Sequence, residues 1–164
     1  MNEYLESLIA KYRTRGVLVD SNLLILYFVG EFAPERIPSL CRTKSFTVDD
    51  FHLLKAIVDS FTVKVTTPNI LTEITNLSDD VPARLREDFF LRLRSSFQLL
   101  DEQYVPSATA AASASFPKFG LSDSVIVEIA NQRYLVLTAE FALAGYLRSV
   151  GTDAINFNNL RRIR

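Results

Sequence analysis

The chain has 164 residues, of which 48% are hydrophobic and 23% are charged. These proportions are ordinary for a globular domain and exclude a collagen-like, coiled-coil or disordered chain. The net charge of −1 at pH 7 excludes a general positive field that would attract nucleic acid, so any such binding needs a local patch or a bound cation.

Two side chains that often mark chemistry occur once each. Cys41 is the single cysteine, which excludes an intrachain disulfide and a cysteine-based zinc site. His52 is the single histidine, so a Ser–His–Asp triad would depend on this one imidazole. The amphipathic, charged first residues lack the apolar core of a signal peptide, and no apolar run is long enough to span a bilayer. We therefore expect a cytoplasmic protein without a membrane partner.

Helical and extended patterns alternate from the start of the chain. Residues 1–15 predict an N-terminal helical extension, because apolar residues recur at three- and four-residue spacing, and Gly16 ends it. The apolar run Val17–Val19 predicts a short buried parallel strand. Residues 23–29 predict a helix that is apolar on every side, and residues 30–46 predict a loop.

The alternation continues to the end of the chain. Thr47 and Asp50 have the spacing of a weak capping box for a helix over residues 48–60, and Thr67 with Pro68 predicts the start of the next helix. Later helices are predicted over residues 82–97, 107–115 and 122–131, and after Thr138. Further strands are predicted at residues 63–66, 98–100, 134–137 and 154–157.

This order of elements predicts the fold class. Alternating strands and helices at this spacing favour an α/β fold, a doubly wound parallel β-sheet of four to five strands with helices on both faces. No internal repeat or interdomain linker is visible, so residues 1–164 are expected to form a single domain.

Four acidic residues are expected at the carboxyl edge of this sheet, where functional groups collect in open parallel sheets. Asp20 directly follows the first strand, and Glu140 follows the strand at residues 134–137. Glu73 lies on the helix after the second strand, and Asp123 opens the helix before the fourth strand. Clustered carboxylates repel one another, and a hard divalent cation such as Mg²⁺ or Mn²⁺ relieves the repulsion. Such ions activate water and stabilise phosphate under attack, which favours phosphodiester hydrolysis.

Short segments in the same order resemble those of the PIN-domain nucleases. Residues 17–22, VLVDSN, are similar to the opening strand and first acid of that family, and residues 69–73, NILTE, to the helix with its second acid. Residues 120–126, GLSDSVI, resemble the segment with the third acid and are the most specific match. Residues 135–141, LVLTAEF, are similar to the strand and segment of the fourth acid, and residues 156–157 to the closing strand.

The resemblance implies a doubly wound parallel sheet, Mg²⁺ or Mn²⁺ as cofactor, and endonucleolytic cleavage of RNA. It also implies the site residues, which are the catalytic and metal-binding carboxylates Asp20, Glu73, Asp123 and Glu140 with Asn22 and Thr138 as polar supports beside them. Within that family the chain resembles the VapC-like toxin ribonucleases, which implies an antitoxin protein as a candidate partner. One departure is Glu140, where the family usually has Asp and the side chain is one methylene shorter.

Two other interpretations stay open. Because of Glu140, the chain could be a catalytically weak or silent PIN scaffold that binds RNA or protein. A phosphoacceptor domain of flavodoxin-like topology could use Asp20, but it needs a Lys after a later strand, where Thr138 and Glu140 stand instead.

Two surface features predict association. The helix over residues 23–29 needs a second apolar cover, either from the N-terminal helix or from a second subunit or an antitoxin, and we expect a homodimer or a partner complex. Arg161, Arg162 and Arg164 form a basic tail that could contact RNA or could simply fray.

Overall fold

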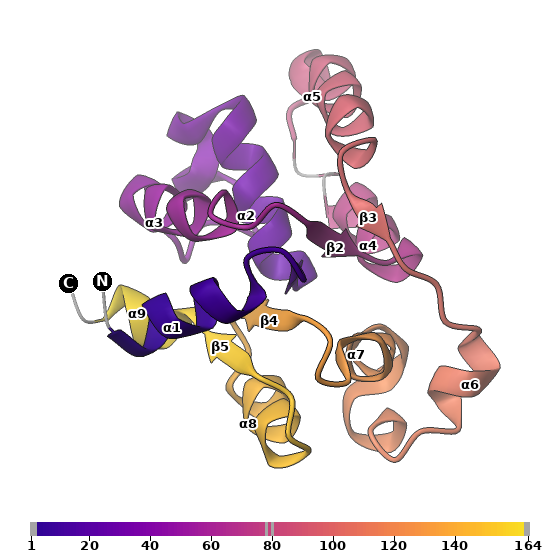
Figure 1. Ribbon diagram of the computed structural model, residues 1–164. Coiled ribbons are helices and arrows are strands. Elements are labelled where there is room, and N and C mark those ends of the chain that lie inside the picture. Colours follow the sequence, from indigo (N-terminus) through magenta and orange to yellow (C-terminus); the bar gives the residue numbers. More distant parts are fainter. Residues whose placement is uncertain (1–2, 78, 80, 163–164) are drawn as a thin grey trace.

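The computed structural model describes residues 3–77, 79 and 81–162, and a five-stranded sheet lies at its centre (Figure 1). The strands are β1 (Val17–Val19), β2 (Lys64–Thr66), β3 (Asp101–Glu102), β4 (Leu135–Thr138) and β5 (Ala154–Asn156). All neighbours pair in parallel in the order β3-β2-β1-β4-β5. The chain therefore winds outward from β1 to one edge and then returns to β4 and the other edge. This is the predicted doubly wound α/β fold.

Helices connect the strands and cover both faces of the sheet. In Figure 1, α2, α3 and α5 lie on one side of the sheet, and α7 and α8 lie on the other. The described helices are α1 (Glu3–Tyr12), α2 (Ser21–Phe32), the 3-10 helix η1 (Pro34–Ser39), α3 (Val48–Val58), α4 (Pro68–Leu77), α5 (Ala83–Phe97), α6 (Ser107–Ala111), α7 (Phe116–Ala130), α8 (Phe141–Ser149) and α9 (Phe157–Arg161). None of them is long and apolar enough to cross a membrane.

The central strands are buried on both faces, as expected for a parallel sheet between two helical layers. Every residue of β1, β4 and β5 is buried. In register, Val19 of β1 lies beside Leu137 of β4, so Asp20 and Thr138 emerge next to each other where these two strands end. The switch in winding direction falls between the same two strands, which is where open α/β sheets place their functional groups.

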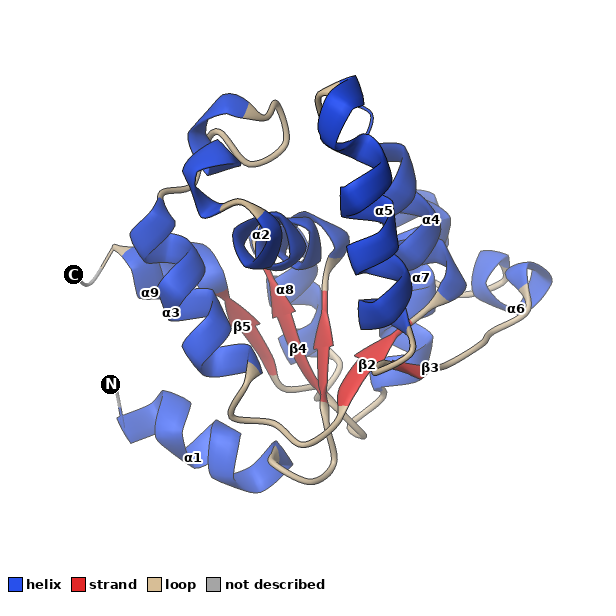
Figure 2. Cartoon of the chain, turned by 90° about the horizontal axis from the view of Figure 1, so that it is seen from above, coloured by secondary structure: helices blue, strands red, loops and turns tan. Residues whose placement is uncertain are grey.

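Helix α1 closes the opposite end of the sheet, near the points where the strands begin (Figure 2). Its apolar side is buried through Leu5, Leu8 and Tyr12. The Tyr12 hydroxyl and the Lys11 ammonium both donate to Oδ2 of Asp153, at 2.9 and 2.7 Å. The predicted N-terminal extension is thus packed onto the domain, and it leaves the carboxyl edge of the sheet open.

Helix α2 is buried within its own chain. Its apolar residues from Leu23 to Val29 are buried except for the half-buried Tyr27, and the helix packs against η1, α3, α4 and α5. The second cover that we expected from the N-terminal helix or a partner is therefore supplied chiefly by these four helices. The homodimer stays a prediction, but α2 no longer supports it.

Several boundaries differ from the sequence prediction. The predicted loop at residues 30–46 holds the end of α2 and all of η1. The third strand lies at Asp101–Glu102 and not at residues 98–100, because α5 and the turn after it extend through that segment. Helix α7 begins before the predicted residue 122, with a kink at Gly120. The capping box of Thr47 and Asp50 is confirmed, with both of its hydrogen bonds present.

Replacing glycine by alanine should have opposite effects on stability at Gly30, where α2 packs closely on α3, and at Gly145, which lies in open space. A Cβ at Gly30 would overlap the ring of Phe51, whereas a Cβ at Gly145 in α8 would meet no atom within 4 Å. We expect Gly30→Ala to lower the free energy of unfolding by about 1–3 kcal/mol through overpacking. Gly145→Ala should raise it by about 0.5–1 kcal/mol, because alanine loses less backbone entropy. Urea denaturation measures both, and a stabilised Gly30→Ala variant would contradict the packing described here.

Candidate functional site

All four predicted carboxylates line one cleft of about 420 Å³ at the carboxyl edge of the sheet. Asp20 follows β1 and is the N-cap residue of α2, and Glu140 follows β4 and is the N-cap residue of α8. Glu73 comes from the second turn of α4, which begins directly after β2. Asp123 lies on α7 just past Gly120, whose φ of 75° breaks the helix and starts it in a new direction. Four separate elements thus bring these acids together.

Asp20 is the most deeply buried of the four, with 3% of its surface exposed. The hydroxyl of Thr138, itself fully buried, donates to Asp20 Oδ2 at 2.6 Å. Burial raises the pKa of the Asp20 carboxyl, and the charge of Glu73 adds to this increase. The hydroxyls of Thr138 and Ser21 and the backbone N–H of Asn22 act in the opposite direction. Burial is the largest of these effects, so the charged form of Asp20 is disfavoured without a cation.

Ser21 connects two of the acids. Its hydroxyl lies 3.2 Å from Oδ1 of Asp20 and forms a hydrogen bond with Oε2 of Glu73. A hydroxyl has one hydrogen to donate, so it cannot satisfy both carboxylates fully at the same time. The contact therefore ties α4 to the start of α2 while leaving carboxylate oxygens available for another partner.

Asp123 shows the repulsion most clearly. Its pKa is raised from 3.8 to about 7, and burial of the carboxyl is the main cause. The charges of Asp20, Glu140 and Glu73 raise it further. Near neutral pH, the metal-free cleft therefore holds a proton on Asp123 for part of the time.

Glu140 lies at the rim and is exposed. Its backbone N–H donates to the Thr138 hydroxyl oxygen at 3.0 Å, so Thr138 contacts both strand-end acids. Desolvation of the carboxyl raises the pKa of Glu140, with smaller contributions from Asp20 and Glu73. The side chain that departs from the PIN pattern thus belongs to the same electrostatic cluster as the other three.

No basic side chain in the described part of the chain neutralises the four carboxylates. Among the described residues, none of the four acids forms an ion pair with Lys or Arg. Arg42 lines the same cleft without such a pair. Within residues 3–77, 79 and 81–162, only hydrogen bonds from Thr138, Ser21 and the backbone therefore compensate the repulsion.

The donor atoms suit a hard divalent cation, because they are carboxylate oxygens at an open cleft. In the part of the chain that the structure describes, no group of three or more Asp, Glu, His or Cys side chains is arranged so that it could hold a metal ion. Mg²⁺ usually keeps several waters and takes only one or two carboxylates from a protein, so a complete protein cage is not required. The residues therefore fit such an ion in chemistry, although the side chains do not form a ready ligand shell.

Several cleft residues were not singled out from the sequence as site residues. Ser21, Asn76 and Phe119 line the cleft together with Arg42. The position of Ser21 directly after the strand-end acid Asp20 could have indicated a place in the site. Its contact with Glu73, however, depends on where α4 lies in the fold. Asn22, predicted as a polar support, lines the cleft, yet its side chain makes no hydrogen bond with another described residue.

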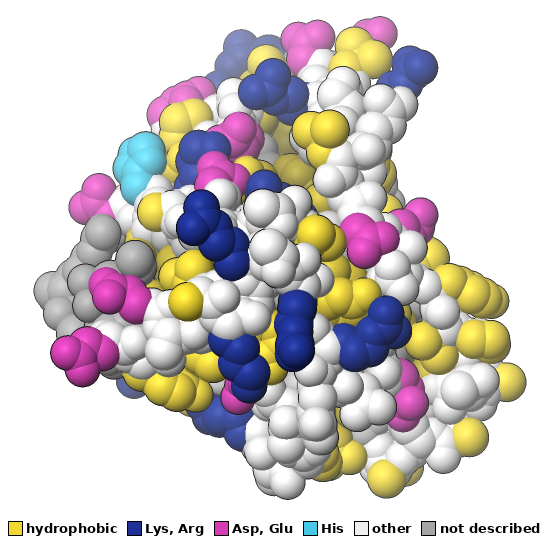
Figure 3. Space-filling model, in the orientation of Figure 1, with side chains coloured by type: hydrophobic (Ala, Val, Ile, Leu, Met, Phe, Trp, Pro, Cys, Tyr) yellow, Lys and Arg dark blue, Asp and Glu magenta, His cyan; other side chains and the backbone are white. Residues whose placement is uncertain are grey.

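The two rare side chains lie outside the cleft. His52 is exposed on α3, where it is visible at the surface in Figure 3, and Cys41 is exposed with a free thiol. A hydrolytic triad built on His52 at this cleft is therefore excluded. Comparisons of the chain with protein-family models, with curated proteins and with solved structures find no match.

The raised pKa of Asp123 predicts how stability depends on pH. Between pH 3.8 and about 7 the folded protein binds more protons at Asp123 than the unfolded chain does, so stability falls as the pH rises through this window. In EDTA, Asp123→Asn should therefore melt a few degrees above the wild type near pH 8, since 1 kcal/mol corresponds to about 2–4 °C in a domain of this size. Near pH 4 the difference should largely vanish.

Glu128→Gln is the matched control, because Glu128 is an exposed acid on the same helix. It should change the melting temperature little at either pH. An Asp123→Asn variant that melts no higher than the wild type near pH 8 would contradict the repulsion inferred for the cleft.

Proposed function

We propose that the chain is a Mg²⁺- or Mn²⁺-dependent endoribonuclease that hydrolyses RNA phosphodiester bonds with Asp20, Glu73, Asp123 and Glu140. The observation that carries this proposal is the convergence of four carboxylates from four elements on one cleft, with no basic partner among the described residues. The choice of RNA as substrate rests on the resemblance to the PIN-domain nucleases.

The electrostatics support a cation in this place. Uncompensated carboxylates destabilise a folded protein, and such arrangements cluster at functional sites. Asp20 and Asp123 would hold the ion directly, with Glu73 and Glu140 as direct or water-mediated ligands. When bound, such an ion activates water and neutralises charge on the phosphate.

The chain's own groups hold the acids in position. Thr138 donates to Asp20 and accepts from the backbone of Glu140, so one buried hydroxyl fixes the spacing of two strand ends. The hydroxyl of Ser21 contacts both Asp20 and Glu73 and so links the end of β1 to helix α4. Hydrogen bonds to ligand carboxylates orient them, and their loss typically lowers activity or affinity about 10- to 100-fold.

The phosphoacceptor interpretation has less support. It requires a Lys near the acid, but among the described residues the basic side chain that lines the cleft is Arg42. An antitoxin partner is proposed from the resemblance to VapC-like toxins, whereas the homodimer and the cytoplasmic location are proposed from the sequence itself. The free Cys41 is compatible with a reducing compartment.

The direct test is cleavage of a labelled RNA by the purified chain. We expect cleavage with Mg²⁺ or Mn²⁺ that stops on addition of EDTA. Asp20→Asn and Asp123→Asn should each abolish it, because an amide of the same shape removes the charge that the cation needs. Glu128→Gln should keep the wild-type rate. Undiminished cleavage by both Asn variants would show that the site assignment is wrong.

The same assay tests the silent-scaffold alternative through Glu140. Glu140→Asp restores the residue that is usual in PIN domains and shortens the side chain by one methylene. If the wild type is active, this variant should cleave at a similar or higher rate. Cleavage that appears only in the Asp variant would identify the wild-type chain as a scaffold.

A further inference from the structure

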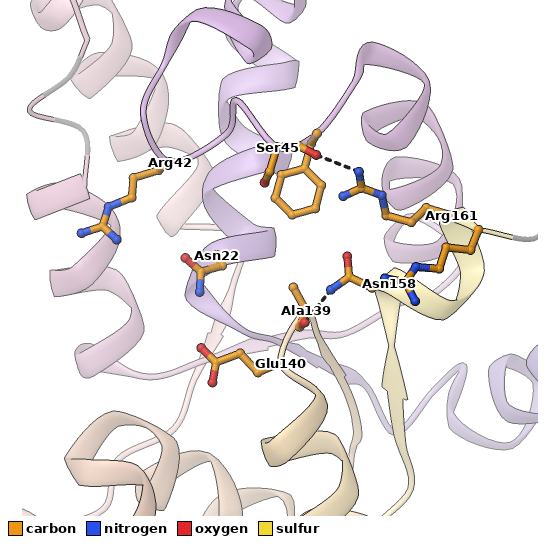
Figure 4. A pocket seen from close by; sticks show the side chains of 9 residues that line it. Asn22, Arg42, Ser45, Ala139, Glu140, Asn158 and Arg161 are labelled. Carbon is orange, nitrogen blue, oxygen red and sulfur yellow. Dashed lines mark hydrogen bonds between the residues drawn. The ribbon is translucent and has the colours of Figure 1, made fainter.

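A second cavity, of about 660 Å³, opens beside the carboxylate cleft (Figure 4). It shares Asn22, Arg42 and Glu140 with that cleft, so the two cavities are adjacent. We call it the basic pocket, and its other lining residues are Ser45, Phe46, Ala139, Asn158, Arg161 and Arg162. The segment after η1 supplies one wall, and α9 supplies the opposite one.

The three arginines of the pocket differ in what they contact. Arg161 donates to the backbone carbonyl of Ser45 at 2.7 Å, and its Nη2 lies 3.5 Å from Oδ2 of Asp50. Its guanidinium also lies over the ring of Phe46, 5.0 Å from the centroid. Arg161 therefore joins α9 to the segment before α3 and holds the pocket walls together.

Arg42 and Arg162 do not join the walls of the pocket as Arg161 does. Both are exposed, and among the described residues Arg42 has no hydrogen bond or ion pair. Arg162 contacts the exposed ring of Phe141, 5.9 Å from its centroid, and its N–H groups donate no hydrogen bond to another described residue. Arg164 of the predicted basic tail lies outside the described residues.

Two exposed guanidinium groups that form no ion pair with another described residue line this cavity, which favours phosphate groups as ligands. Each offers five N–H donors in a planar fork that matches phosphate oxygens. Asn22 is a further polar group that lines both cavities, and Glu140 is the one acid among the described lining residues of the basic pocket. Because the whole chain carries a net charge of −1, a polyanion needs a local patch of this kind.

We propose that the basic pocket binds the backbone phosphates next to the scissile bond of a single RNA strand, with Arg42 and Arg162, on opposite walls of the pocket, as donors to different phosphates. This inference rests on the proposed function, since it places the scissile phosphate at the carboxylates. Arg42 lines both cavities and so lies where consecutive phosphates would pass from one to the other.

The test measures binding without cleavage. Fluorescence anisotropy of a short single-stranded RNA is titrated with the full chain in EDTA, over a range of salt concentrations. Arg42→Gln and Arg162→Gln should each lower the slope of log affinity against log salt by about 0.7, which corresponds to roughly eightfold weaker binding near 50 mM salt. Arg94→Gln, at an exposed position on α5 outside the basic pocket, is the matched control and should leave slope and affinity unchanged.

A single-stranded DNA of the same sequence should show the same losses, because the proposed contacts are to phosphate. Unchanged binding in both pocket variants, an equal loss in Arg94→Gln, or no binding by the wild type at low salt would overturn the proposal. If the pocket variants bind RNA more weakly but the wild type cleaves no RNA, phosphate binding by the basic pocket is supported and the proposed nuclease activity is refuted. The two proposals can therefore be distinguished.

Discussion

The structure depends on how a carboxylate is kept at the buried end of a parallel strand. Asp20 is 3% exposed and stands where β1 ends, at the switch in winding direction of the sheet. An ionised group in that position is strongly disfavoured unless hydrogen bonds or an opposite charge compensate it. Thr138 and Ser21 supply part of this compensation through their hydroxyls. Within the described chain no opposite charge neutralises the carboxylate further. This missing positive charge is the reason to propose a bound cation.

The fold adds further negative charge around Asp20 and brings no neutralising cation of the described chain to it. Parallel pairing of β1 with β4 brings Asp20 and Thr138 side by side, and the kink at Gly120 directs Asp123 toward the same cleft. Arg42, whose guanidinium forms no ion pair with another described residue, lines the cleft and also the basic pocket beside it. An acidic end that attracts a cation and a basic end that attracts an anion are thus adjacent. A substrate that brings phosphate groups in series would meet both.

The sequence predicted those features that depend on local pattern. Strands β1 and β4 are runs of buried apolar residues, and Asp20 and Glu140 lie directly beyond them, so their place at the carboxyl edge followed from strand direction alone. Strand β3 could not be placed, because Asp101 and Glu102 are exposed and have no apolar signature. The cover of α2 and the contact of Ser21 with Glu73 depend on packing between elements distant in sequence, which periodicity does not encode. The basic pocket likewise arises from a loop and a terminal helix that meet only in the folded chain.

The most direct test of the central claim is anomalous scattering from a crystal of the wild-type chain soaked in Mn²⁺. We predict a cation peak in the carboxylate cleft, with oxygens of Asp20 and Asp123 rotated to coordinate it and waters in the remaining positions. A cleft that stays free of Mn²⁺, with Asp20 still held by the hydrogen bonds from Thr138, Ser21 and the backbone of Asn22, would contradict the account.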